Sequence, residues 1–200
     1  MKWQSRFAYG EELYLQKGIR LFASVLSAAI SGMEVCPVQV EADVSSGLPC
    51  FTMVGFPSTQ VKEAQDRVRT ALKNNGISLP PKKVTVNLAP ADLRKEGAGF
   101  DLPVAAAVLA ASGFIEPQLL RNVMVVGELS LNGEVRSVSG VLPRVIRARE
   151  LGCRYCIIPF ENLAEGALVK DMKVVGVQKY KRSFEACLRS GCIWKRKSVF

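Results

Sequence analysis

Histidine is absent from the 200-residue sequence, and this absence limits the metal chemistry open to the chain. A zinc site would have to be built from four of the six cysteine thiolates. The candidates are the C-x-x-C spacing of Cys153 and Cys156 and the pair Cys187 and Cys192. Cys156, however, begins the apolar run 156–159, as a buried strand residue does. We therefore interpret the cysteines as ordinary reduced thiols of a cytosolic protein, with structural zinc as the alternative.

Long apolar runs are also absent. No stretch reaches the roughly 18 consecutive apolar residues that a membrane-spanning helix needs, so we expect no membrane association. The nearest approach to a secretory signal is Leu21–Ile30, which is short, begins late and follows Glu11 and Glu12. We interpret that run as a β-strand.

The net positive charge is small in the body of the chain, although the net charge of the whole is +9. Residues 179–200 carry seven basic side chains against Glu185, and residues 1–20 carry four basic and two acidic ones. Residues 21–178 are left with a net charge of only +1. We expect a domain over 21–178, an N-terminal extension over 1–20 and a basic tail over 179–200, and the even charge of the body argues against a broad basic platform.

The chain lacks the nucleotide-binding motif G-x-x-x-x-G-K-[ST], although it has a glycine loop, KEGAGFDLP, at residues 95–103. In this loop Gly97 and Gly99 are followed by Phe100 and Asp101, which supply neither the lysine nor the hydroxyl that would reach phosphate and magnesium. The dinucleotide pattern G-x-G-x-x-G fails as well, because Leu102 stands at the third glycine position. The loop is therefore not expected to bind a nucleotide, and we expect no cofactor in this chain.

Hydrophobic periodicity indicates an α/β (α+β) fold in a single domain. Strands are predicted over 21–30, 35–44, 50–55 and 82–89, and shorter ones at YCIIP and KVVGVQ. Ser58 is expected to cap one helix, with Asn74-Asn75-Gly76 ending it, and Asp101 to cap a second. Pro143 is expected to open a third helix, and NLAEGALV a short fourth. The segment NVMVVGELSLNGEV predicts a strand, a tight Asn132-Gly133 turn and a returning strand.

This order of elements resembles the proteolytic domain of Lon-type proteases. There a serine in a glycine-containing loop and a lysine downstream of a G-E-x-x-x-x-G-x-V hairpin form the catalytic dyad. The hairpin is matched at Gly127, Glu128, Gly133 and Val135. The serine position, however, falls on Gly99 and the lysine position on Leu142. The resemblance thus implies a Lon-like fold, which is a mixed sheet with packed helices, in a domain that we do not expect to be an enzyme. A peptidase with displaced groups, drawing on Ser112 or Ser139, is the alternative.

A more extensive resemblance, from about residue 21 to 177, is to the N-terminal domain of the ComM/YifB family of magnesium-chelatase-like AAA+ proteins. Its most specific stretch is NLAPADLRKEGAGFDLP, which holds Asn87, Pro90, Asp92, Gly97, Gly99 and Asp101. The resemblance implies a cytoplasmic bacterial protein whose Lon-like domain precedes an ATPase, assembles as a hexamer through that ATPase, and takes part in DNA branch migration during natural transformation. The 200 residues contain no Walker motif, so ATP and Mg²⁺ are expected only for an AAA+ module outside this chain.

DNA is a further partner that the resemblance implies, because a related Lon-like domain in the RadA recombination protein touches DNA. Arg94 and Lys95 in the loop, and Lys82 and Lys83 at the start of the 82–89 strand, are the candidate phosphate contacts. The alternative is that these cations serve solubility or edge protection, which the body's charge of +1 favours. A third interpretation is nucleic-acid binding by the 179–200 tail alone.

Overall fold

The computed structural model describes residues 21–179, and its core is one seven-stranded sheet. The sheet order is β3-β4-β2-β1-β5-β8-β9, and β6 and β7 form a separate two-stranded hairpin. Strand bounds are β1 Leu21–Ser31, β2 Glu34–Ser45, β3 Cys50–Val54, β4 Lys83–Ala89, β5 Val123–Val125, β6 Glu128–Leu129, β7 Val135–Arg136, β8 Tyr155–Pro159 and β9 Val174–Val177. The β1–β2 and β2–β4 pairs are antiparallel, whereas the β3–β4, β1–β5, β5–β8 and β8–β9 pairs are parallel.

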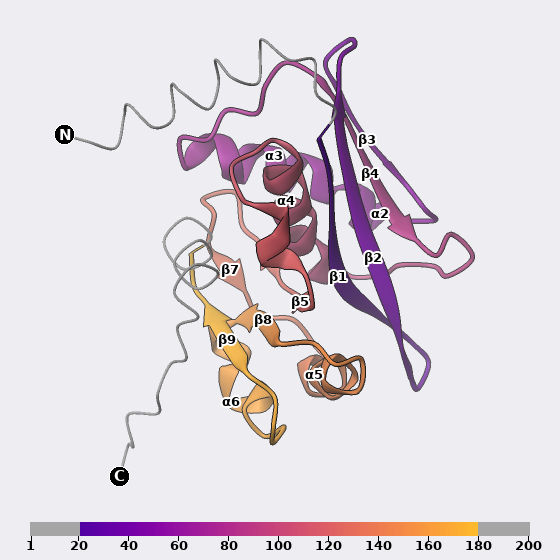
Figure 1. Ribbon diagram of the computed structural model, residues 1–200, viewed down its shortest axis with the longest axis vertical. Helices are drawn as coiled ribbons and strands as arrows, with labels where there is room; N and C mark the ends of the chain where they lie inside the picture. The colour runs from indigo at the N-terminus through magenta and orange to yellow at the C-terminus, as the bar shows by residue number, and fades with distance from the viewer. Residues whose placement is uncertain (1–20, 180–200) are drawn as a thin grey trace, which may run out of the picture.

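Helices lie on both faces of this sheet (Figure 1). They are α2 Thr59–Lys62, α3 Ala64–Asn74, α4 Asp101–Ala111, α5 Val141–Glu150 and α6 Leu163–Gly166, with 3₁₀ turns η1 Ala98–Phe100, η2 Pro117–Leu120 and η3 Phe160–Asn162. α4 packs on β1 and β2 with α3 beside it, while α5 packs on β2 and β8, and α6 on β8 and β9. Every residue of α4 is buried, as expected of a helix that is apolar all round.

The burial of each strand follows from what covers it. In β2 and β4 buried and half-buried residues alternate, because one face of these strands packs on the main core beside α4 while most of the other face is open to solvent. In β5 and β8 successive residues such as Cys156, Ile157 and Ile158 are all buried, because helices cover both faces there. Within residues 21–179 no helix combines the length and the apolar character needed to cross a bilayer.

The mixed α/β fold predicted from the sequence is confirmed, and so are several local signals. Ser58 Oγ accepts a hydrogen bond from Val61 N at 3.4 Å at the start of α2, and Asn75 ends α3. The predicted apolar stripe is buried along α2 and α3, in the order Val61, Ala64, Val68, Ala71 and Leu72.

Three predicted boundaries were wrong. The helix after Ser58 is interrupted at Glu63, which separates α2 from α3. α5 begins at Val141, two residues before Pro143. The segment 122–136 is not one hairpin, because β5 joins the main sheet and only β6 and β7 pair across the turn, whose Ser130 carbonyl accepts from Gly133 N at 2.9 Å.

A junction at the end of β4 joins two loops through a buried lysine. Lys95 is 0% exposed, and its ammonium donates to the carbonyl oxygens of Gly55, at 2.8 Å, and Pro90. Its backbone also bonds to the neighbouring loop, since Ser58 N donates to the Lys95 carbonyl at 2.9 Å. Burial lowers the pKa of the Lys95 ammonium. The 55–58 and 90–95 loops are therefore held together by the Lys95 ammonium, which donates a hydrogen bond to a carbonyl oxygen of each loop.

Gly55 should not tolerate a side chain. Its φ is +92°, and a Cβ there would lie 2.3 Å from the Leu88 carbonyl oxygen. We expect Gly55→Ala to lower the free energy of unfolding by more than about 3 kcal/mol, measured by urea denaturation. Gly97→Ala is the matched control, because Gly97 has φ +81° but nothing within 4 Å of a Cβ. It should cost about 1–2 kcal/mol of backbone strain. Equal effects would contradict the clash.

Lys95→Met should also destabilise the fold. Methionine fills a similar volume but leaves the Gly55 and Pro90 carbonyls without their donor. We expect a loss of about 1–3 kcal/mol in the free energy of unfolding. Lys83→Met is the control, because Lys83 is exposed at the start of β4, and it should change stability by less than about 0.5 kcal/mol. A Lys95 variant as stable as the native chain would show that these bonds contribute nothing net.

Candidate functional site at the β4–α4 loop

The glycine loop leads from β4 through η1 into α4, and hydrogen bonds of its backbone fix its path. Gly99 O accepts from Gly127 N at 3.0 Å, and Gly127 O accepts from Leu102 N at 2.9 Å. These two bonds attach the loop to the chain that leaves β5. Gly127 is closely packed, since a Cβ there would lie 3.1 Å from both the Leu102 and Val135 side chains. The loop and the predicted hairpin motif are therefore in direct contact.

Asp101 anchors the loop by a buried ion pair. Its carboxylate is 0% exposed and accepts from Arg67 Nε at 2.7 Å, Arg67 Nη2 at 2.9 Å and Leu129 N at 3.1 Å. The hydrogen bond to Asp101 raises the pKa of the Arg67 guanidinium. The predicted helix cap at Asp101 was wrong: the residue has helical φ and ψ as the first residue of α4. Its carboxylate binds α3 and β6 instead of the amides of its own helix.

The two dyad positions lie on segments that the fold brings together. A Cβ on Gly99 would be in ordinary van der Waals contact with Val126, at 3.5 Å, and with Val138, at 3.9 Å. Val138 lies on the segment that enters α5, where Leu142 N donates to Glu165 Oε1 at 2.8 Å. The Leu142 side chain packs against the apolar cluster under α5. The loop therefore has room for a side chain at position 99, and an aliphatic group stands at position 142.

The alternative hydroxyls lie elsewhere. Ser112 ends α4, whose eleven residues put it about 15 Å along the helix from Asp101. Its hydroxyl oxygen is buried with no hydrogen-bond partner among the described residues. Ser139 is exposed, and its carbonyl accepts from the buried Arg144 guanidinium, which also donates to Ala28 O at 3.0 Å. Burial lowers the pKa of Arg144.

The four predicted phosphate contacts are not brought together. Lys95 was wrongly predicted, because its side chain is buried in the loop junction and cannot reach a ligand in solvent. Arg94 is exposed and pairs with Glu96 at 3.1 Å. Lys82 and Lys83 lie at the opposite end of β4, a strand of seven residues, and thus about 20 Å from the loop.

The remaining motif residues have structural places. Asn87 Nδ2 donates to Glu41 Oε2 at 2.9 Å across β2 and β4. The peptide bond before Pro90 is cis, and Asp92 is exposed in the loop beside Lys95. Glu128 pairs with Arg136 in the hairpin register, and Gly133, at φ +82°, packs against Asn75.

The cysteines in the described range do not form a metal site. No cluster of three or more His, Cys, Asp or Glu side chains suited to a metal occurs within residues 21–179. Burial raises the pKa of Cys156 to about 12 and also raises that of Cys153. The C-x-x-C pair is thus two neutral thiols at neutral pH. Cys187 and Cys192 lie outside the described residues.

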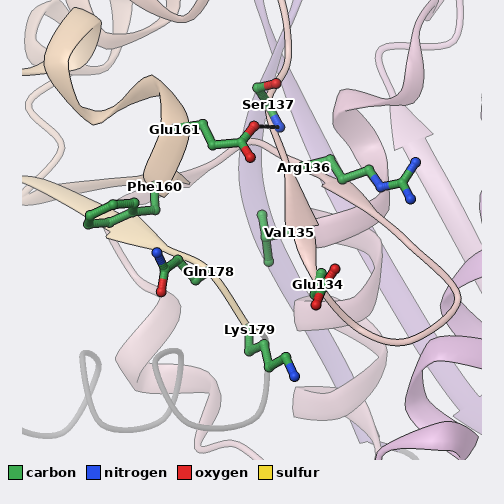
Figure 2. A pocket seen from close by; sticks show the side chains of 8 residues that line it. All are labelled: Glu134, Val135, Arg136, Ser137, Phe160, Glu161, Gln178 and Lys179. Atoms are coloured by element: carbon green, nitrogen blue, oxygen red, sulfur yellow. Dashed lines mark hydrogen bonds between the residues drawn. The ribbon is translucent and has the colours of Figure 1, made fainter.

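A surface pocket of about 660 Å³ lies away from the loop, between β7, η3 and the end of β9. Figure 2 shows Glu161 beside Ser137, whose backbone N donates to the Glu161 carboxylate at 3.3 Å. The lining combines Glu134, Arg136 and Lys179 with the apolar Val135 and Phe160. Val135 N also donates to Gln178 O at 2.8 Å, which attaches the end of β9 to the hairpin. The pocket has no nucleophile paired with a base.

Comparison with known proteins identifies relatives over most of the described range. Residues 40–162 match the family model for subunit ChlI of Mg-chelatase. The chain is 46% identical to the competence protein ComM of Haemophilus influenzae over 156 residues, which cover 78% of this chain and 30% of that protein. It is 47% identical to the protein YifB of Salmonella typhimurium over 147 residues, covering 74% of this chain and 29% of that protein.

Two further relatives are more distant in sequence. The DNA repair protein RadA of Halalkalibacterium halodurans is 28% identical over 184 residues, 88% of this chain and 38% of that protein. Lon protease 2 of Bacillus subtilis is 26% identical over 133 residues, 65% of this chain and 23% of that protein. The chain spans about 30% of the length of the ComM and YifB relatives. By the ChlI match and these identities, the chain belongs to the magnesium-chelatase-like ComM/YifB family.

Proposed function

We propose that this chain is a non-catalytic Lon-like module of a ComM/YifB-type AAA+ protein that processes DNA. The observation that supports the proposal is that the glycine loop is firmly anchored, as an active-site loop would be, while the residues at the two dyad positions have unreactive side chains. The loop is anchored by Asp101 and backbone bonds, while Gly99 and Leu142 stand where the Lon-type mechanism needs a hydroxyl and an amine. Neither residue can act as nucleophile or base.

The role of such a module is to support an ATPase ring and to engage DNA. The relatives are about two and a half times as long as this chain, so the ATPase, its ATP and Mg²⁺, and a hexameric ring belong to the proposal for the whole protein. The name of the RadA relative, a DNA repair protein, supports DNA as the substrate class. Branch migration in natural transformation, in the bacterial cytoplasm, is the process that we propose.

The buried lysine also argues for a structural loop. In a serine–lysine pair the lysine must accept a proton from the hydroxyl, which requires a free amine near it. The Lys95 ammonium is the cation nearest along the chain to the glycines, and two of its three donors bind the carbonyl oxygens of Gly55 and Pro90. Ser112 lies at the far end of α4, so the displaced-dyad alternative lacks a matched pair.

A serine-reactive probe tests the non-catalytic part. We expect the full chain to remain unlabelled by a fluorophosphonate, because no hydroxyl lies beside a free base in the loop. The readout is in-gel fluorescence, with an active serine hydrolase as positive control and Ser112→Ala with Ser139→Ala as background. Stoichiometric labelling that maps to Ser112 or Ser139 would instead support the displaced-dyad peptidase.

A binding titration tests the DNA part. We expect the full chain to bind duplex DNA with an affinity that falls steeply between about 50 and 200 mM salt, because phosphate contacts release counterions. Replacing the six basic residues of 181–197 with serine should weaken this binding without abolishing it. Complete loss in that variant would assign binding to the tail alone. Absence of binding by the native chain at low salt would refute DNA engagement. Arg94, Lys82 and Lys83 stay candidate contacts in this scheme.

A further inference from the structure

Three neighbouring parallel strands begin side by side at the same end of the main sheet, and a basic residue precedes the amino end of each strand. Arg121 lies two residues before β5, Arg154 directly before β8 and Lys173 directly before β9. The strands are paired in the order β5-β8-β9, with Val123 opposite Tyr155. Backbone bonds hold the starts in register, since Arg154 N donates to Asn122 O at 2.7 Å and Cys156 N to Lys173 O at 2.9 Å. We call Arg121, Arg154 and Lys173 the basic row.

The basic row is open to solvent, and none of its cations forms an ion pair with a carboxylate of residues 21–179. All three side chains belong to exposed residues. Among residues 21–179, the ion pairs within 4 Å are made by Arg67, Arg94 and Arg147, and the row takes part in none of them. Asp171 is the acidic neighbour in the chain and is also exposed, but it forms no ion pair with the row at that distance. Three unneutralised cations at a rigid edge favour an anionic ligand with several charges.

Tyr155 holds two of the cations in place. The guanidinium carbon of Arg154 lies 5.4 Å from the centre of the Tyr155 ring, and Lys173 Nζ lies 5.7 Å from it. Each distance is within the range of a cation–π attraction, which offsets the repulsion between two like charges held close together. The ring itself is half-buried and packs against the main core. A ligand therefore meets partly ordered cations and loses less conformational entropy in binding them.

We infer that the basic row binds the phosphate backbone of DNA, an inference that rests on the proposed function. Three cations over two strand spacings extend about 10 Å, which is about three steps of 3.4 Å along the duplex axis, so each cation can meet a different phosphate of one strand. Because the Tyr155 ring already faces two cations, it is not free to stack on a base. Contact is therefore to phosphate alone and is indifferent to sequence.

The test is a salt titration of the full chain on a short duplex, followed by fluorescence anisotropy. For the triple variant Arg121→Ala, Arg154→Ala, Lys173→Ala, the association constant K should fall less steeply with salt. The magnitude of the slope of log K against log salt should decrease by about 2–3, since each lost phosphate contact removes about 0.9. At the lowest salt its Kd should rise at least about tenfold. All three residues are exposed, so a thermal melt should show an unchanged fold.

A charge-matched control separates a defined site from general attraction. The triple variant Lys62→Ala, Arg69→Ala, Lys73→Ala removes the same charge from exposed positions on α2 and α3. Its slope should stay within about 0.5 of the native value, because it removes no phosphate contact. Equal losses in the two triple variants, or native binding by the basic-row variant, would overturn the inference while leaving DNA engagement intact. A native chain that does not bind would instead refute the proposed DNA function, and the inference with it.

Tyr155→Leu tests the role of the ring. Leucine keeps apolar bulk against the core but removes the attraction for the two cations. We expect Kd to rise about two- to fivefold, equivalent to one cation–π attraction of about 0.5–1 kcal/mol, with an unchanged salt slope because no cation is lost. A merely structural role for Tyr155 would lower the melting temperature and leave Kd unchanged in the folded protein, which would overturn the positioning role.

Discussion

The buried pair of Asp101 and Arg67 is the interaction on which the rest of the site depends. A buried carboxylate is costly unless it is paired and its remaining oxygens accept hydrogen bonds. Asp101 meets this condition with two bonds from Arg67 on α3 and one from Leu129 N on β6. A single side chain at the start of α4 thereby fixes a helix and a hairpin that lie far apart in the sequence. Removing Arg67 would leave the Asp101 carboxylate buried without its cation, whereas Arg67 without Asp101 would keep its ion pair with Glu63 at 3.4 Å.

This anchoring explains how the loop keeps its shape without using the side chains at positions 99 and 142. The path of residues 97–102 is fixed by Asp101 and by backbone bonds between Gly99, Gly127 and Leu102. None of these bonds uses the side chains at positions 99 and 142. The shape of the loop therefore does not depend on a serine at position 99 or a lysine at position 142, and the Leu142 side chain adds apolar contact under α5. For this reason the loop motif can be present in a chain that has glycine at position 99 and leucine at position 142.

The features that could be predicted from the sequence are those that neighbouring residues determine. Alternation in β2 and β4, the Ser58 cap and the glycine turn at 133 are short-range signals, and the structure confirms the mixed fold that they indicate. The sequence could not predict contacts that depend on distant partners. Asp101 looked like a helix cap because its ion-pair partner is 34 residues away. Lys95 looked exposed because lysine is rarely buried, and only the meeting of two loops supplies its carbonyl acceptors.

The basic row escaped sequence analysis for a related reason. Arg121, Arg154 and Lys173 are isolated cations in the sequence, and only the β5-β8-β9 order makes them neighbours. They lie at the amino ends of these strands, whereas the anchored loop contacts the chain just beyond the carboxyl end of β5. At the carboxyl end of β5 the chain is bound to the loop that Asp101 and Arg67 anchor, whereas the surface pocket lies just beyond the carboxyl ends of β8 and β9. A DNA contact at the amino edge would use none of the groups that a Lon-type protease needs, so the two edges can change independently.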